Sequence, residues 1–415
     1  MEFNTAPSFN LHIDINSCFA TIEQQANPFF RGKPLVVASY PTRGGCVLAS
    51  SIEAKKLGIK TGMRVFEGQN IYPKLVVLKP DPWKYRNVHL KLRNLISEYT
   101  NNFSPKSIDE FALNLKDYAT LKDGPLRVVG QEIKERIKKE IGDWLTVSIG
   151  IAPNRYLAKI AAGLHKPDGL DEINKDNFKE IYKKLKLTDL TGIKNANAAR
   201  LNAFGIYSVL DFYSSPVWKL KSAFHSITGL YWQMRLLGHE IDDVEFARRS
   251  YGNSVAIGKN ISKTEDLAPI LARLTEKMCS RLRTAGYRAS GVHLALVYKN
   301  GTYWHKGRQI NKNYFDTRDI YRAAFKLLSE ANPDSPVLNI AVSCFNLSKN
   351  ESLQLNFFED EIKKEKIVRS LDLVNDRWGA FTVAPARGFS GAKVVLDRIA
   401  FGGVKELEEF SLLNS

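Results

Sequence analysis

Residues 10–26 read "NLHIDINSCFATIEQQA" and change their hydrophobic pattern partway along. The first part alternates strictly, with Leu11, Ile13 and Ile15 on one face and His12, Asp14 and Asn16 on the other. Such a period of two predicts a β-strand that is buried on one face. The residues that follow are expected to form a helix, and Asn16 or Ser17 is suited to cap it. The stretch therefore predicts a strand that presents Asp14 and leads directly into a helix.

A second stretch, "SPKSIDEFALNL" at 104–115, places Asp109 and Glu110 side by side before an apolar run. Neighbouring side chains of a regular strand point to opposite faces. We therefore expect irregular backbone near Ile108 to Glu110, where a turn or bulge re-aims a side chain. The alternation should resume at Phe111, Leu113 and Leu115.

Composition favours an ordered globular protein of several domains. The chain has 415 residues, of which 44% are hydrophobic and 25% charged, and this length suggests roughly two to four domains. The N-terminal "MEFNTAPSFN" lacks the layout of a signal peptide, and no apolar run approaches the ~20 residues of a membrane span. Four scattered cysteines form no metal spacing. We expect a cytoplasmic monomer without membrane contact.

The charge of the chain predicts a polyanionic partner. The formal net charge is +16, and residues 244–348 hold 16 Lys and Arg against 8 Asp and Glu. Residues 349–415 hold 10 against 11, so the C-terminal part does not share the basic character. Nucleic acid is the leading partner for such a distribution, although excess charge also serves solubility.

The order of predicted elements indicates an α+β multidomain protein. Strands and helices alternate up to about residue 170, whereas residues 171–240 read as nearly all helix around "TGIKNANAARLNAFGI". After a linker at 241–247, the pattern of 248–348 is β-α-β-β-α-β, the split βαβ arrangement, with a hairpin at Asn300 and Gly301.

Three carboxylates make a candidate metal site. If non-consecutive strands bring Asp14 beside Asp109 and Glu110, the three charges repel unless a cation such as Mg²⁺ neutralises them. Two such ions would clamp the attacking and leaving oxygens of a phosphoryl transfer. From local pattern alone, a solvated strand face and an acidic turn remain alternatives.

Residues next to the carboxylates are suited to a triphosphate. The helix opening at Ser17, Cys18 and Phe19 would offer backbone N–H groups beside Asp14. Lys159 could reach phosphate as a point charge. Core packing for Phe19 and a solvated position for Lys159 are the alternatives.

In this order and spacing, "HIDINSCFATIEQ", "GKPLVV", "IEAKKLGIKTGM", "SIDE" and "SIGIAPNRYLAKIAAGLHKPDGL" resemble the Y-family, or translesion, DNA polymerases. The resemblance spans roughly residues 10–350. It implies a right-hand polymerase with a ferredoxin-like palm, small fingers, a helical thumb with a helix-hairpin-helix, and a split-βαβ little finger. The implied boundaries are 1–18 and 82–170 for the palm, 19–81 for the fingers, 171–240 for the thumb, 248–348 for the little finger and 349–415 for a C-terminal extension.

The resemblance also implies roles for single residues. Asp14, Asp109 and Glu110, with the main-chain carbonyl of Ile15, would hold two Mg²⁺ ions, for which Mn²⁺ can substitute. Phe19 would exclude ribonucleotides, and Lys159 would hold the triphosphate of a deoxynucleoside triphosphate. In the thumb hairpin, backbone amides and Lys194 would hold phosphates of primer–template DNA.

Several positions depart from the family pattern: Cys18 replaces a common aromatic, "GIK" replaces "GIG", and two more changes concern the triphosphate. Ile52 stands where many members have a tyrosine that hydrogen-bonds the triphosphate, and Lys55 replaces an arginine. Lys55 keeps the charge but loses the bidentate fork. These changes affect nucleotide affinity and fidelity more than the reaction itself.

A short peptide after the little finger resembles those that bind the bacterial sliding clamp. In "LQLNFFED", the anchors would be Gln354, Leu355, Phe357 and Phe358. An end of a strand packed on its own domain is an equal alternative.

The resemblance implies a template-directed DNA polymerase of low fidelity that bypasses lesions. A catalytically silent DNA-binding scaffold and a nucleotide cyclase on a similar palm are the rivals. The presence of all three carboxylates disfavours the scaffold, and the thumb motif with the basic C-terminal module disfavours the cyclase.

Overall fold

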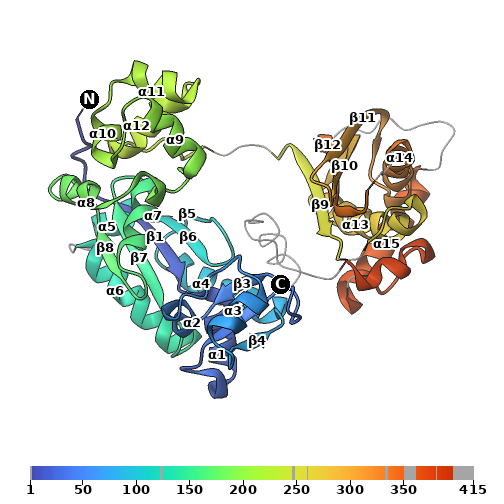
Figure 1. Ribbon diagram of the computed structural model, residues 1–415, viewed down its shortest axis with the longest axis horizontal. Coiled ribbons are helices and arrows are strands. Elements are labelled where there is room, and N and C mark those ends of the chain that lie inside the picture. The colour runs from blue at the N-terminus through green and yellow to red at the C-terminus, as the bar shows by residue number, and fades with distance from the viewer. Residues whose placement is uncertain are drawn as a thin grey trace. The chain divides into compact units, whose positions relative to one another are not determined.

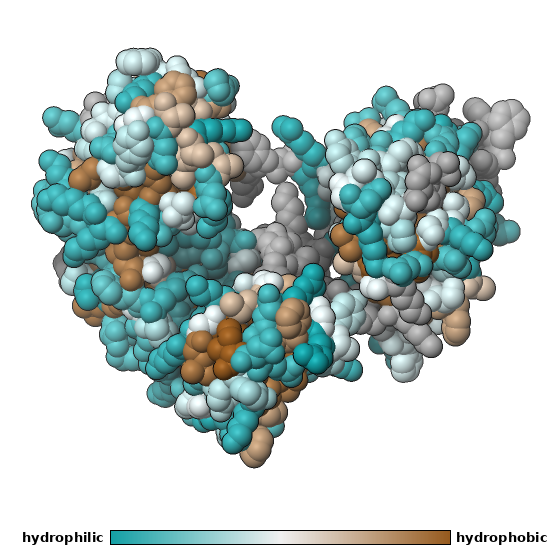
Figure 2. All heavy atoms as spheres, viewed as in Figure 1, coloured by the Kyte–Doolittle hydropathy of each residue, from teal (hydrophilic) through white to brown (hydrophobic). Residues whose placement is uncertain are grey.

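The structure is a computed structural model that describes residues 2–121, 125–244, 248–258, 260–331, 335–349, 361–379 and 381–395 (Figure 1). The described residues form two compact units, 2–244 and 248–395. Hydrophilic side chains cover much of the visible face of each unit, with smaller hydrophobic patches between them (Figure 2). Within the described residues, no helix is both long and apolar enough to cross a bilayer.

A five-stranded sheet organises the first unit. Its order is β5 (Phe103–Pro105), β6 (Glu110–Asn114), β1 (Asn10–Ile15), β7 (Val147–Ala152) and β8 (Leu170–Glu172). All neighbours are antiparallel except β7 and β8, which are parallel. The first strand therefore lies at the centre of the sheet, between two strands that come from distant parts of the chain.

Different helices pack on the two faces of this sheet. The predicted apolar face of β1, with Leu11, Ile13 and Ile15, is buried in one core with residues of α4 (Pro82–Ser97) and α6 (Leu126–Arg136). Helix α7 (Arg155–Leu164) packs on β1 and β7. It approaches at Gly150, where an added Cβ would lie 2.0 Å from the carbonyl oxygen of Ala158. The side chain of Asn154 caps α7 by accepting from the Leu157 N–H.

Residues 18–78 add a second, smaller sheet to the first unit. Its order is β3 (Val47–Ser50), β2 (Leu35–Ala38) and β4 (Val76–Leu78). Three helices accompany it: α1 (Cys18–Ala26), α2 (Ile52–Lys56) and α3 (Val65–Ile71). The connection from β1 to α1 is short, so the tip of the central strand of the large sheet lies beside this second sheet and its helices.

The rest of the first unit is helical, as predicted. It contains α8 (Phe178–Lys184), α9 (Asn195–Ala203), α10 (Val209–Ser214), α11 (Val217–Phe224) and α12 (Thr228–Leu236). These helices share a core with the apolar face of α7, which includes Leu157 and Ala161. Shared burial ties this helical part to the large sheet.

The second unit has the predicted order of elements. These are β9 (Ser250–Ala256), α13 (Thr264–Thr284), β10 (Tyr287–Tyr298), β11 (Tyr303–Tyr314), α14 (Thr317–Glu330) and β12 (Val337–Lys349). The sheet order is β11-β10-β12-β9, and both helices pack on it. A further helix, α15 (Glu361–Trp378), is tied to α13 by a bidentate ion pair from Arg283 to Asp372. Gln354, Leu355, Phe357 and Phe358 of the candidate clamp peptide lie outside the described residues.

We predict that Gly150→Ala destabilises the first unit by about 1–3 kcal/mol, because its Cβ would collide with the backbone of α7. Differential scanning calorimetry measures the effect. Gly163→Ala, in α7 itself, is the control: its Cβ would meet nothing within 4 Å, so its free energy of unfolding should rise by about 0.5–1 kcal/mol. An unchanged melting temperature for Gly150→Ala would contradict the close packing of α7 on the sheet.

Candidate active site

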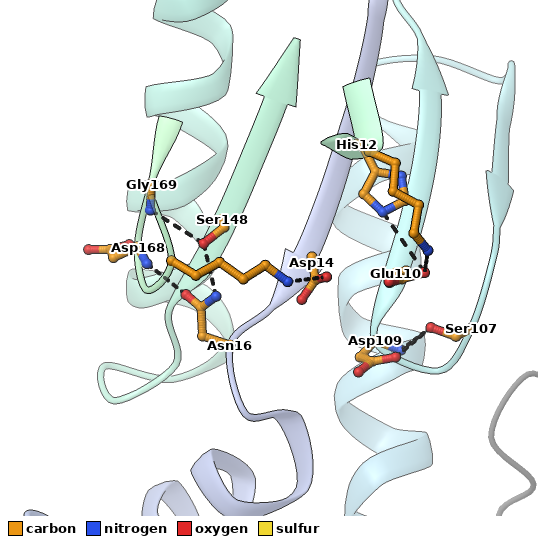
Figure 3. Close-up of polar contacts among 11 residues, drawn as sticks. His12, Asp14, Asn16, Ser107, Asp109, Glu110, Ser148, Asp168 and Gly169 are labelled. Carbon is orange, nitrogen blue, oxygen red and sulfur yellow. Dashed lines mark hydrogen bonds and ion pairs between the residues drawn. The ribbon is translucent and has the colours of Figure 1, made fainter. Parts of the chain in front are cut away.

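The register of the large sheet aligns three polar residues across three strands. Asp14 on β1 lies directly opposite Glu110 on β6 and Ser148 on β7. Directly opposed residues point to the same face of a sheet. The side chains of Asp14 and Glu110, which are distant in sequence, therefore meet on the α7 side (Figure 3).

The backbone before β6 is irregular, which confirms the prediction for this segment. Residues 106–109 form bends, and the regular strand begins only at Glu110. The Asp109 carbonyl oxygen accepts from the Ile15 N–H at 3.0 Å, and the Ser107 hydroxyl bonds to the Asp109 carboxylate. Phe111, Leu113 and Leu115 are buried, as predicted. The bend thus holds the Asp109 backbone against the tip of β1.

Burial makes the ionised carboxylates costly. It raises the pKa of Asp14 to about 6, with Lys166 opposing the shift and the charges of Glu110 and Asp109 adding to it. Burial likewise raises the pKa of Asp109. For Glu110, burial is the largest single cause and acts in the same direction, but the hydrogen bond from Lys159 and the charges of the surrounding basic groups together outweigh it, so the pKa is lowered. The cluster therefore favours a nearby cation.

Two lysine ammonium groups supply positive charge to the cluster. Lys159 Nζ, from α7, lies 2.6 Å from Glu110 Oε2. Lys166 Nζ, from the loop between α7 and β8, lies 2.5 Å from Asp14 Oδ2. Sequence analysis singled out Lys159 and missed Lys166, whose only signal was a basic residue in "HKPDG", shortly after α7.

His12 is a further neighbour that sequence analysis did not single out. Its side chain is 2% exposed, and its Nε2 lies 3.9 Å from Glu110 Oε2. Burial lowers the pKa of His12 to about 3, against the pull of the Glu110 charge. One ligand atom each from His12, Asp14 and Glu110 lie within 4.8 Å of one another. His12 is therefore neutral, and its buried Nε2 has no hydrogen-bond partner among the described residues.

A cleft of about 500 Å³ opens beside the carboxylates. It is lined by Asp14, Ile15, Asn16, Ser17, Cys18, Phe19, Leu48, Ala49, Ser50, Ile52, Lys55, Lys56, Thr61, Asp109, Lys166 and Pro167. Most of the predicted site residues thus share one cavity. The lysine that lines it beside Asp14 is Lys166, whereas Lys159 is held by Glu110.

The start of α1 differs from the expected capped helix. Ser17 occupies the N-cap position in the left-handed region, with φ 54°, and its side chain makes no capping hydrogen bond. The Thr21 hydroxyl instead donates to the carbonyl oxygens of Asn16 and Ser17. The left-handed residue turns the chain sharply from β1 into α1, so the capping expected from Asn16 or Ser17 was wrong.

Phe19 and Lys55 line the cleft from two elements. Phe19 is 2% exposed and stacks on Tyr85 of α4, with ring centroids 4.2 Å apart and planes at 8°. The Lys55 pKa is lowered by burial and by the charge of Lys166, against the opposing pull of Asp14 and Asp109. Two lysines and the carboxylates therefore lie within electrostatic reach of one another around the cavity.

The residues present fit a divalent cation. Two lysine ammonium groups already stand where positive charge is needed, and Asp14, Asp109 and the main chain of Ile15 line one cavity. Clustered carboxylate and carbonyl oxygens are the donors that hard cations such as Mg²⁺ prefer. Asp14, Asp109, Glu110 and the Ile15 carbonyl are the candidate ligands.

Two family models match the chain. The impB/mucB/samB family matches residues 13–163, and the C-terminal domain of the same family matches residues 248–357. DNA polymerase IV of Pelotomaculum thermopropionicum is 29% identical over 391 residues, covering 93% of this chain and 96% of that protein. DNA polymerase IV 2 of Bacillus subtilis is 27% identical over 402 residues, covering 94% and 96%.

Solved structures agree with the sequence comparisons. A Y-family DNA polymerase chimera of Dbh and Dpo4 is similar with a TM-score of 0.73 and 25% identity, covering 82% of this chain and 99% of that one. An insertion ternary complex of Dbh, at 24% identity and a TM-score of 0.58, shares the fold.

The fold and the carboxylate site define a nucleic-acid polymerase. The chain belongs to the impB/mucB/samB family, the Y family of DNA polymerases. It is a DNA-directed DNA polymerase, and polymerases of this family depend on divalent metal ions.

We predict that Asp109→Asn keeps or raises the melting temperature of the metal-free protein near neutral pH. Because the folded-state pKa of Asp109 is raised, its ionised form costs stability above that pKa, and asparagine removes the cost. Thermal unfolding in EDTA measures it. Asp211→Asn is the control of opposite sign: burial opposes the shift, but hydrogen bonds from Ser208 and Tyr207 lower the Asp211 pKa, so its melting temperature should fall. A clear loss of stability in Asp109→Asn would contradict this electrostatic picture.

Proposed function

We propose that the cleft adds deoxynucleotides to the 3′-end of a primer by a two-metal mechanism, with low fidelity and with bypass of damaged template bases. The observation that carries the proposal is that Asp14 and Asp109, from two segments far apart in sequence, line one cavity beside the start of α1, while Glu110 lies directly opposite Asp14 on the neighbouring strand. Mg²⁺ is the proposed ion, with Mn²⁺ as a substitute. Two bound ions would polarise the attacking 3′-hydroxyl and the leaving pyrophosphate.

The chain's own residues would divide the work around the reacting phosphate. Asp14 and Asp109, with the Ile15 carbonyl, would hold the ions, and Glu110 would help to place the one nearest the 3′-hydroxyl. Backbone N–H groups of Ser17, Cys18 and Phe19 would meet the triphosphate at the start of α1. Lys55 and Lys166 line the same cavity and would balance its charge. Lys159 forms an ion pair with Glu110 and would hold that carboxylate in place, unless the lysine moves to contact a bound nucleotide.

The parts of the chain would then act as a polymerase hand. The five-stranded sheet, within 1–18 and 82–170, would be the palm, and residues 19–81 the fingers. The helices of 171–240 would be the thumb, and 248–348 the little finger. These assignments draw on the element order and on the matched family models.

Primer–template DNA is the proposed partner of the second unit. Its 16 basic residues against 8 acidic ones within 244–348 suit a phosphate backbone. On the sheet face opposite the buried Val292 and Leu294, the register aligns Gly252, Ser343, His293 and Gly307 in one row. The small residues of such a row would allow a DNA backbone to approach closely. Clamp binding through residues 354–358 stays a prediction.

Primer extension tests the proposed reaction. With Mg²⁺, the protein should extend primers on undamaged and abasic templates, and Asp109→Ala should lower the rate on the order of a hundredfold to a thousandfold, since it removes a charge at the reacting phosphates. No extension by the unmutated protein with DNA binding intact would indicate the silent scaffold instead. Synthesis of a cyclic nucleotide without DNA would indicate the cyclase.

Replacing Phe19 tests its proposed contact with the sugar. Phe19→Ala should raise the efficiency of ribonucleotide relative to deoxyribonucleotide incorporation, because the ring that would meet a 2′-hydroxyl is removed. Single-nucleotide insertion of ATP and dATP opposite thymine measures the ratio, which is insensitive to a uniform loss of folded protein. Tyr85→Leu removes the stacking partner of the ring and serves as the control; it should change the ratio less. An unchanged ratio in Phe19→Ala would assign the ring to packing alone.

A further inference from the structure

The loop that carries Lys166 is held by hydrogen bonds at its far side. It runs from the end of α7 to β8, and Asp168 within it adopts the left-handed region with φ 63°. The Asp168 N–H donates to Asn16 Oδ1 at 2.8 Å, and the Gly169 N–H donates to Ser148 Oγ at 3.3 Å. Ser148 lies on β7 and Asn16 directly follows β1, so the loop is fixed to the same framework as the carboxylates (Figure 3).

Asn16 and Ser148 form a buried pair behind this loop. Asn16 Nδ2 donates to Ser148 Oγ at 2.9 Å, and the two residues are 4% and 0% exposed. An amide is suited to this position because it accepts from the loop and donates to the serine at the same time. A carboxylate could not donate, and an apolar residue would leave buried polar groups without partners.

Asn16 follows Asp14 by two residues at the tip of β1. The same strand tip therefore presents Asp14 to Lys166 from one side and anchors the Lys166 loop from the other. Asp168 is also tied to α6 by a hydrogen bond from Lys134 to its carbonyl oxygen, and to the helical turn after α6 by a 3.1 Å hydrogen bond from Lys138 to its carboxylate. Asn16 and Ser148 connect the loop directly to the central strands, as does the Ile149 N–H of β7, which donates to the Gly169 carbonyl oxygen at 3.0 Å.

We propose that Asn16 is a positioning residue that, with Ser148, fixes Lys166 for contact with the triphosphate of the incoming nucleotide. This inference rests on the proposed function of the cleft. A lysine side chain loses much rotamer freedom when it is immobilised. If its loop is already held in place, Lys166 can bind phosphate with a smaller loss of conformational entropy. Nucleotide affinity should therefore depend on Asn16, although Asn16 itself acts through Lys166.

Asn10 provides a matched control on the same strand. It is also 4% exposed, and its amide donates to the Pro153 carbonyl oxygen at 2.8 Å, at the opposite end of β1 from Asn16. Asn10→Ala and Asn16→Ala each remove a buried amide with its hydrogen bonds, one at the start of β1 and one directly after its end. Thermal unfolding of both variants shows whether their costs in stability are comparable.

The test measures the Kd of dATP for the complex of the full-length protein with Mg²⁺ and a dideoxy-terminated primer opposite template thymine. We expect Asn16→Ala and Ser148→Ala to raise this Kd by about tenfold, the effect of one or two lost hydrogen bonds. Asn10→Ala should leave it within about twofold, which is less than the loss of one such bond. In single-turnover extension at saturating dATP, Asn16→Ala should retain most of its rate.

A double-mutant cycle identifies the route of the effect. Lys166→Ala should raise the same Kd, and adding Asn16→Ala to it should raise it no further, because both changes remove one contact. Full additivity, an unchanged Kd in Lys166→Ala, or an equal rise in Asn10→Ala would overturn the inference. If Asp109→Ala extended primers as fast as the wild-type protein, this result would instead count against the proposed function. The two failures are therefore distinguishable.

Discussion

Repulsion among buried like charges is the constraint on which the site depends. Asp14 and Glu110 face each other across neighbouring strands, and Asp109 is held against the same strand tip by its own backbone. Burial raises the pKa of two of these carboxyl groups, so the folded chain has to supply positive charge or accept it from solution. Lys159 and Lys166 supply it here. A divalent cation would provide more charge than either lysine and would leave the lysine side chains free for phosphate.

The framework around the carboxylates brings these cations into place. Gly150 lets α7 lie directly on β7, which carries Lys159 to Glu110. The chain then turns back toward β8, and that turn carries Lys166 to Asp14. The central strand serves both sides of the cleft, since its tip leads through a left-handed Ser17 into α1. Small changes at the tip of β1 are thus felt by the metal ligands and by the phosphate-facing side chains together.

Much of the fold follows from local pattern. Period-two alternation identified β1, the acidic pair identified the bend before β6, and the β-α-β-β-α-β order of the second unit was read from periodicity alone. These signals work because burial acts on each element separately. The predicted capping at Ser17 failed because the tight turn from strand to helix imposes a left-handed residue there, and its side chain makes no capping hydrogen bond. Lys166 and His12 were missed because their partners lie on other strands.

The sequence by itself determined the family, the central strand and the three carboxylates, since a few motifs with fixed spacing carry them. Only the tertiary structure decided which cations face which carboxylates, and that Asn16 and Ser148 hold the loop of Lys166. The physical reason is that the two kinds of feature depend on residues at different separations along the chain. Hydrophobic period is a property of neighbouring residues, whereas an ion pair between Lys166 and Asp14 depends on the register of strands and the return path of a loop.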